Sequence, residues 1–327
     1  SFENILKINE NSFLINLLNY EKKDEAEIVI KFSGYKDKKD KIYIKSASII
    51  EEKNKIEIKN IKFDKHLKIE KFDKINLNYI DKDNKPNSIN FYRDKKKYVL
   101  KGDYFNSDNL IDDILFSDEK SDYFSNDFEI YLDIKKIFLD EEFQLNDLKG
   151  TLLFKNKELS DGNLQGFFPN NKKMQFTVKT TDNNKITTLF IEEAKTFVKR
   201  YKFIKGFDGG VLDFYSSKVG NVSNSTLKIY DFKLKELPTL TKILTLASLQ
   251  GIADILSGEG IRFNELEMNF ENKDNLINID EVYAIGPAIS VLMNGYIEKN
   301  KLISLRGTLV PATTINKAIG SIPVLGK

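Results

Sequence analysis

Apolar and polar residues alternate along most of this 327-residue chain. The run FEIYLDI at residues 128–134 is the clearest case, and similar runs fall at residues 27–32, 41–45, 55–59 and 75–79. Successive side chains of a strand point to opposite faces, so each run has one apolar face and one polar face. The alternation therefore predicts a mainly β protein built on an antiparallel sheet that is wet on one side.

Turn-forming residues separate these runs, for example at 83–86, 160–163 and 182–184. Each of Gly, Pro, Asn and Asp favours a turn for its own physical reason. The spacing of about 10–15 residues is typical of hairpins and meanders, and regular helical patterns do not separate the runs. Glycines such as Gly150 and Gly295 fall inside runs, where they mark either bulges and bends or simple turns. We therefore expect a long, curved and twisted antiparallel sheet that forms an open apolar groove.

Three segments show a helical pattern. Helices are expected at about 107–116, 192–201 and 239–257, the last preceded by Pro238 and ended by Gly258. The third is the longest and has a wide apolar face, which either packs in a core or serves as a plug or lid over an open groove. Its candidate plug or lid residues are Leu240, Ile243, Leu244, Ala247, Ile252, Ile255 and Leu256.

Composition narrows the classes of function. Lys and Arg total 51 against 49 Asp and Glu, which gives a net charge of +2. Proteins that bind nucleic acid usually carry a clear excess of basic residues, and this chain does not. The absence of Cys excludes disulfides, zinc–thiolate sites and thiol catalysis, and it fits an oxidising compartment. The single histidine, His66, has no second His or Cys to act with and is expected to be a surface or strand residue.

Motifs for catalysis are also missing from the sequence. Residues 257–260 read SGEG, which lacks the order of a phosphate-binding loop and follows a helix instead of a strand. The adjacent acids at 112–113, 141–142 and 192–193 give no sign of converging across a cleft. No nucleophile elbow is present. We expect a protein that is not an enzyme, with no catalytic residues, no metal site and no cofactor.

Several C-terminal segments resemble the C-terminal domain of the AsmA-like proteins, closest to the long YhdP type. These segments are GFDGGVLDFY (206–215), LKIYDFKLKELPTLTKILTLASLQGIADILSGEGIRFNELEMNF (227–270), IGPAISVLMNGYI (285–297), LRGTLVPATTIN (305–316) and IPVLGK (322–327). The most specific are LASLQGIADILSGEGIRF and the pair GTLVPATTIN and IPVLG. The match covers roughly residues 128–327, and the first hundred residues resemble the family only as β-repeats.

The resemblance implies a bridge-like lipid-transfer protein of the Gram-negative envelope. It implies a periplasmic segment of a longer protein anchored in the inner membrane, carrying phospholipid acyl chains between the inner and outer membranes and supporting outer-membrane integrity. Residues 1–105 would form an N-terminal β-repeat part of the groove, and residues 106–327 the AsmA-like C-terminal region. The partners expected are phospholipid, the two membranes through segments absent from this sequence, possible envelope proteins, and no nucleic acid.

Groove-facing positions follow from the clearest alternations, although apolar residues on a sheet also pack on protein. The candidates that would contact lipid are Ile130, Leu132, Ile134, Leu152, Phe154, Phe176, Val178, Leu227, Ile229, Met268, Phe270, Ile289, Val291 and Met293. The alternative function is a periplasmic assembly factor that binds outer-membrane protein strands at an open sheet edge, by β-augmentation.

Overall fold

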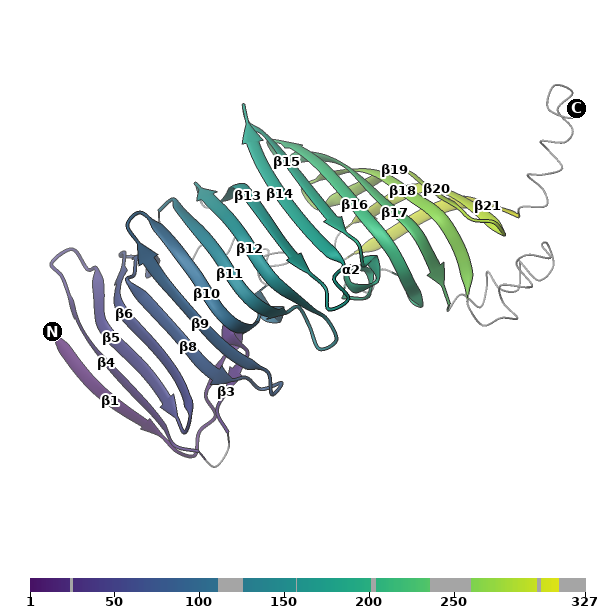
Figure 1. Ribbon diagram of the computed structural model, residues 1–327. Helices are drawn as coiled ribbons and strands as arrows, with labels where there is room; N and C mark the ends of the chain where they lie inside the picture. Colours follow the sequence, from purple (N-terminus) through teal and green to yellow (C-terminus); the bar gives the residue numbers. More distant parts are fainter. Residues whose placement is uncertain are drawn as a thin grey trace, which may run out of the picture. The chain divides into compact units, whose positions relative to one another are not determined.

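The computed structural model describes residues 1–23, 26–110, 126–156, 158–200, 204–235, 260–298 and 301–311. The described chain is mainly β, with one large open sheet of 19 strands and a separate two-stranded sheet formed by β2 and β3 (Figure 1). This architecture confirms the predicted fold class. The chain divides into two compact units, Ser1–Asn171 and Lys172–Lys327. The predicted division at 105/106, which followed the family resemblance, stays a prediction.

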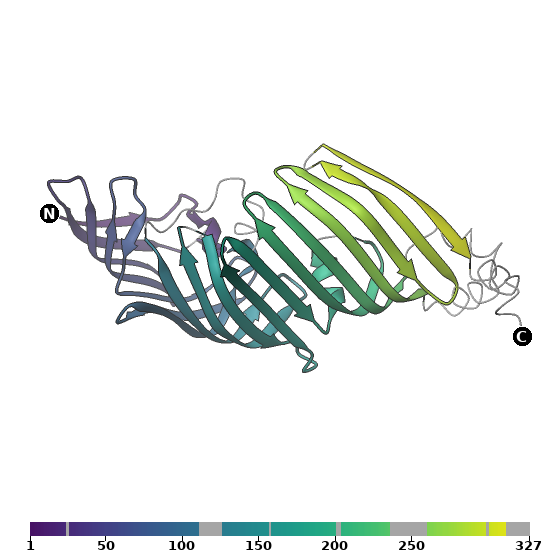
Figure 2. The same cartoon turned by 90° about the horizontal axis from the view of Figure 1, so that it is seen from above.

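Strands make up nearly all of the first unit, and they form a curled sheet (Figure 2). In spatial order, β1 pairs with β4, and the sheet continues through β5, β6, β8, β9, β10, β11 and β12 to β13. The elements are β1 (Phe2–Ile8), β2 (Leu14–Ile15), η1 (Asn16–Leu18), β3 (Tyr20–Glu21), β4 (Ile28–Lys36), β5 (Ile42–Glu51), β6 (Asn54–Phe63), β7 (Ile69–Lys71), β8 (Lys74–Ile80), β9 (Pro86–Asp94), β10 (Lys97–Asn106), β11 (Phe128–Phe138), β12 (Gln144–Lys155) and β13 (Glu158–Phe167).

One pairing in this unit departs from the predicted antiparallel order. Strands β10 and β11 are parallel, with Tyr98 opposite Ile130 and Leu100 opposite Leu132. A parallel pair needs a long crossover connection, which here is residues 107–127. Residues 108–110 are helical, as expected for the predicted helix at 107–116, and the rest of that helix lies outside the described residues.

Aromatic side chains close one end of the apolar face of the first unit. Phe72, in the link between β7 and β8, is fully buried and stacks on Tyr98 with ring centroids 4.6 Å apart. Ile61 completes this cluster, and partly buried residues of β5, β6, β8, β9 and β11 pack around it. Burial of such large apolar side chains is worth about 1.5–3 kcal/mol each, so this end is a local core.

A short segment of the chain closes the other end. Tyr20 of β3 is buried, and its hydroxyl donates to Glu51 Oε2 at 2.8 Å, while Asn54 Nδ2 donates to the same oxygen at 2.9 Å. Tyr79 anchors the segment further by donating to the carbonyl oxygen of Leu18 at 2.7 Å. Burial and the Glu51 carboxylate raise the pKa of Tyr20, which keeps the phenol protonated as the donor. The segment is therefore held by polar groups that are buried and paired.

In the part of the second unit that the structure describes, strands β14 to β21 form an antiparallel meander, with a short helix between β15 and β16. Its elements are β14 (Lys173–Thr181), β15 (Asn184–Ile191), α2 (Ala194–Arg200), β16 (Phe207–Val219), β17 (Val222–Leu234), β18 (Ile261–Lys273), β19 (Leu276–Ile285), β20 (Ile289–Glu298) and β21 (Leu302–Pro311). The helix α2 confirms the helix predicted at 192–201. The predicted helix at 239–257, with all its plug or lid residues, lies outside the described residues. The helical segments that the structure describes do not have both the length and the apolar character needed to span a bilayer.

Helix α2 packs at one end of the apolar face of the second unit. Phe207, Phe232 and Phe263 stack beside it across three strands, with centroid separations of 5.0 and 5.2 Å. Gly210 lies where β16 meets the helix, with φ +85°, and a Cβ atom there would be 3.2 Å from Cβ of Ala194 and from Phe232. The position needs glycine for two reasons, its backbone conformation and the close approach of the helix.

We predict that Gly210→Ala destabilises the second unit more than Gly220→Ala does. Gly220 also has positive φ, +61°, but a Cβ atom there meets nothing within 4 Å. The Gly220 variant therefore measures the backbone cost alone, about 1 kcal/mol, and the Gly210 variant adds crowding of about 1–3 kcal/mol. Urea unfolding midpoints of the two variants and the parent chain test this order. Equal midpoints would contradict the close packing of α2.

Candidate functional site

Directly opposed residues on neighbouring strands share a face, so the registers of the second unit define its apolar side. The positions fall into rows that cross the strands. The row nearest α2 contains Met174, Ile191, Leu212, Ile229, Leu266, Ala284, Val291 and Leu309. The next row, here called the apolar strip, contains Phe176, Leu189, Phe214, Leu227, Met268, Val282 and Met293.

The row nearest α2 is buried over part of its length. Ile191, Leu212 and Ile229 are buried where the helix and the phenylalanine stack cover the sheet, and Met174, Leu266 and Val291 are half-buried. Along the apolar strip, every residue except Val282 keeps part of its surface exposed. The strip is thus a continuous apolar floor that the described chain covers only in part. Such half-covered apolar surface is a candidate site for an apolar ligand.

The first unit carries a comparable floor between its two closed ends. One cross-strand row holds Phe32, Ala47, Ile58, Ile75, Phe91, Leu100 and Leu132, and all but Leu132 are half-buried. The Phe72 cluster lies at one end of the strands and the Tyr20 segment at the other. The Phe72 cluster packs against Ile58, Ile75 and Phe91 of this row, so the floor of the first unit is partly covered by its own chain and is less open than the apolar strip.

The structure places the residues predicted to face the groove on these apolar faces, with different exposure. Ile130, Leu152, Phe154, Phe176, Leu227, Met268, Phe270, Val291 and Met293 are half-buried. Leu132, Ile134, Val178, Ile229 and Ile289 are buried, so they have little surface to offer a ligand. Contact with lipid stays a prediction for all fourteen. Sequence alternation gave the face, but it could not give the exposure, because that depends on the segments that fold over each end.

The opposite face of the sheet is polar and rich in ion pairs. In the second unit Lys228 Nζ lies 2.7 Å from Glu267 Oε2, and Tyr283 donates to the same oxygen at 2.8 Å. The Lys228 ammonium and the neighbouring donors lower the pKa of Glu267 to about 2. In the first unit Lys97 pairs with Glu129 at 2.7 Å. Matched cross-strand charges of this kind suit a face that stays in water.

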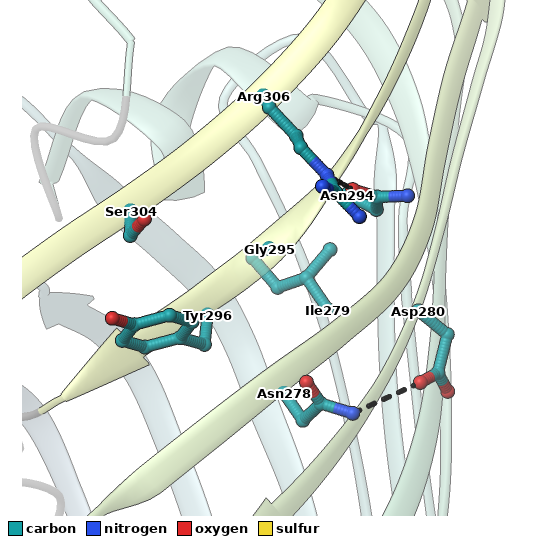
Figure 3. Close-up of a pocket in the computed structure, with 8 residues that line it drawn as sticks. All are labelled: Asn278, Ile279, Asp280, Asn294, Gly295, Tyr296, Ser304 and Arg306. Carbon is teal, nitrogen blue, oxygen red and sulfur yellow. Dashed lines mark hydrogen bonds between the residues drawn. The ribbon is translucent and has the colours of Figure 1, made fainter.

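A hollow of about 450 Å³ lies on the polar face of the second unit. It is lined mainly by polar side chains around Gly295, and it is drawn in Figure 3. Arg306 Nε donates to Asn294 Oδ1 at 3.0 Å, and Asn278 Nδ2 donates to Asp280 Oδ1 at 3.2 Å. Sequence reasoning missed this hollow, which adjoins a bulge at Asp280 of β19 and draws its lining from three strands.

Other residues considered from the sequence have local structural roles. His66 is exposed in a turn, where its backbone N–H donates to Asp64 Oδ1 at 2.8 Å. Glu192 accepts from the backbone N–H of Lys173 at 2.6 Å, and Glu193 pairs with Lys172 at 2.8 Å. Within the described ranges, no group of three or more His, Asp or Glu residues is placed to hold a metal ion.

Comparisons with known protein families, curated proteins and solved structures found no match to this chain. The class that the fold itself defines is an open, curved β-sheet with a half-covered apolar face.

An ion-pair clamp fastens α2 over the closed end of the second unit. Asp208 of β16 lies 2.7 Å from Lys195 Nζ of the helix and 2.7 Å from Lys235 Nζ after β17. These two ammonium groups, Lys195 first, lower the pKa of Asp208 from its ordinary 3.8 to about 2. The helix thus depends on a carboxylate that stays charged in mildly acidic solution.

We predict that the clamp stabilises α2 above pH 4 and is lost as pH falls toward 2. A carboxylate whose folded-state pKa is depressed contributes its full stability above the unfolded-state pKa, and that contribution falls progressively as pH drops to the folded-state pKa. Because the pair is partly exposed, Asp208→Asn should cost only about 1 kcal/mol at neutral pH. Hydrogen exchange of the α2 amides measures the difference from the parent chain at each pH.

Asp213→Asn is the matched control, since Asp213 is exposed on the same strand. That variant should leave α2 exchange unchanged. A difference between the Asp208 variant and the parent chain that persists undiminished at pH 2 would show that the charge is not what holds the helix.

Proposed function

We propose that this chain is a non-enzymatic carrier of phospholipid acyl chains. The observation that carries the proposal is the apolar strip, a row of large side chains that crosses the second unit and keeps part of its surface exposed. The similar floor of the first unit supports it. In this function the sheet takes the place of the bilayer interior, and the polar face remains in water.

The energetics explain why such a surface would be useful. Each CH₂ group moved from a bilayer into water costs about 0.8 kcal/mol, so one sixteen-carbon chain costs about 12 kcal/mol and two about 25 kcal/mol. A barrier of this size makes transfer through water very slow. An apolar strip removes much of that cost without any catalytic group. Strands spaced about 4.8 Å apart extend the face from β14 to β21 over roughly 35 Å.

The cellular setting of the proposal comes from the AsmA-like resemblance of residues 128–327. On that basis the chain is a periplasmic part of a protein anchored in the inner membrane of a Gram-negative bacterium, and it supports outer-membrane integrity. The fold is of the kind that the resemblance implies, a curved open sheet. The lipid-carrying surface itself is argued from the apolar strip, independently of the resemblance.

A charge placed on the apolar strip should abolish lipid retention. In Phe176→Glu, a carboxylate would replace a half-buried ring on the strip, where an ionised group beside an acyl chain is strongly disfavoured. We expect at least a tenfold loss of co-purified phospholipid, measured by lipid extraction and mass spectrometry. Thr177→Glu is the control, because Thr177 is the next residue and is exposed on the opposite face.

The control variant should retain lipid as the parent chain does, and circular dichroism should show both variants folded. Equal lipid content in the two folded variants would overturn the assignment of the strip. A delipidated parent chain that never binds phospholipid in native mass spectrometry would overturn the function as a whole.

A second function, assembly of outer-membrane proteins by β-augmentation, is favoured by a different observation. Within the described residues β21 pairs only with β20, so its outer edge is unpaired. Leu302, Ile303 and Leu305 of β21 are exposed, and they include residues on both faces of the strand. An exposed apolar edge strand of this kind can pair with a strand of another protein. This function predicts that a photo-crosslinker at Thr308 of β21 captures a partner strand. Capture of lipid alone would exclude it.

A further inference from the structure

The hollow on the polar face of the second unit is built from two rows of side chains that cross β19, β20 and β21. The first row is Asn278, Tyr296 and Ser304, and the second is Asp280, Asn294 and Arg306, with Asp280 at the bulge of β19. At the usual dimensions of a sheet the rows lie about 7 Å apart, and each is about 10 Å long. Six polar side chains thus surround one hollow of about 450 Å³.

Gly295 lies between the two rows and sets the path of β20. Its φ is +151°, and a Cβ atom there would be 2.0 Å from the carbonyl oxygen of Ser304 on β21. Only glycine allows the two strands to approach so closely in this conformation. Figure 3 shows Tyr296 on one side of Gly295 and the Arg306–Asn294 pair on the other. The floor between the rows is therefore bare backbone.

The two charged side chains of the hollow have neutral partners only. Arg306 Nε donates to Asn294 Oδ1 at 3.0 Å, and Asp280 Oδ1 accepts from Asn278 Nδ2 at 3.2 Å. Neither Arg306 nor Asp280 forms an ion pair with a residue that the structure describes. A guanidinium has five N–H donors and a carboxylate has several acceptor positions, so most of their hydrogen-bonding capacity is left to water or to a ligand.

Tyr296 adds an aromatic ring to these polar groups. The side chain is 40% exposed, and Ser304 is directly opposite on β21. Within the described part of the chain, the hydroxyl groups of Tyr296 and Ser304 have no hydrogen-bond partner. The ring has an apolar face and a polar tip. The lining of the hollow therefore combines donors, acceptors and one apolar ring, and its two charges sum to zero.

These groups match the chemistry of a neutral sugar. Each sugar hydroxyl is both a donor and an acceptor, so it can accept from Arg306 while it donates to Asp280. Hydrogen bonds to such charged groups are stronger than those between neutral groups. The C–H face of a sugar ring can pack on the ring of Tyr296. A simple anion or cation fits less well, because it would meet a like charge in the same hollow.

We propose that this hollow is a binding site for a neutral glycan, with Tyr296 as the packing surface and Arg306 and Asp280 as the main hydrogen-bonding groups. The site goes beyond the lipid-carrying function and is independent of it. It lies on the wet face of the sheet, whereas the apolar strip lies on the opposite face.

The test uses saturation-transfer NMR with three neutral trisaccharides, maltotriose, cellotriose and tri-N-acetylchitotriose, each at millimolar concentration with the whole chain. Irradiation of the aromatic protons of the protein should transfer saturation to the ring C–H protons of at least one of the three. Arg306→Gln should weaken binding of that trisaccharide by about tenfold or more, because it removes a charged hydrogen-bonding group. Tyr296→Ala should reduce both the affinity and the saturation transfer.

Tyr215→Ala is the matched control for Tyr296→Ala. Tyr215 is also an exposed tyrosine of the polar face, at 45%, but it lies on β16 and does not line the hollow. That variant should bind the trisaccharide as the parent chain does. Phe176→Glu, which alters the apolar strip on the other face, should also keep glycan binding. Circular dichroism confirms that each variant is folded before binding is measured.

The remaining outcomes would overturn the glycan site. A parent chain that binds none of the three trisaccharides contradicts it, and so does equal loss of binding in the Tyr215 and Tyr296 variants. A large excess of glycine, a small zwitterion, should not displace the trisaccharide. If glycine does displace it, the hollow binds a pair of opposite charges, and its assignment to a neutral glycan is wrong. None of these results bears on lipid retention, so the two functions can fail separately.

Discussion

The register of the interstrand hydrogen bonds is the constraint on which the rest of the structure depends. Alternation within one strand gives that strand an apolar side, but a slip of one residue between neighbours would turn that side toward water. In the second unit Ile279 and Val282 are three residues apart and still share the apolar face, because the pairing shifts by a bulge between them. The β18 side shows the same bulge, because Phe270 pairs with Ile279 and Asn269 with Glu281. One extra residue in β19 therefore keeps the apolar face continuous from β18 to β20 on both sides of the bulge.

Both units use their own chain to close the ends of the apolar face, and they do so with different chemistry. In the second unit α2, a phenylalanine stack and the Asp208 clamp cover one end. In the first unit Phe72 covers one end and the hydrogen-bonded Tyr20 segment covers the other. A sheet wholly buried by its own chain would gain more stability from apolar burial. The half-buried apolar residues between the covered ends keep surface that the described chain does not bury. That surface is available for an apolar ligand to cover.

Much of the fold could be predicted from the sequence. The features that were missed depend on which strands pair and in what register, and alternation within one strand does not give either. Alternation in residues 128–134 gave the strand and its apolar side, and the short apolar pattern at 192–201 gave α2. The parallel pairing of β10 with β11 was missed, because a single predicted helix at 107–116 does not distinguish a crossover between parallel strands from an insertion between antiparallel ones. Leu189 and Phe214 of the apolar strip were missed as well. They become neighbours on one face only when the β15–β16 register is known.

The two faces of the second unit differ in chemistry, and that contrast carries the functional argument further than apolar area alone. On the wet face a lysine costs little, and Lys228 has a carboxylate opposite it. The apolar strip instead carries one uncharged, apolar side chain on each strand from β14 to β20. An ionised group laid on that strip would lose its hydration without gaining a partner, whereas an acyl chain would lose only unfavourable contact with water. The strip therefore favours hydrocarbon over charged or polar ligands, which is the selectivity that a carrier of acyl chains needs.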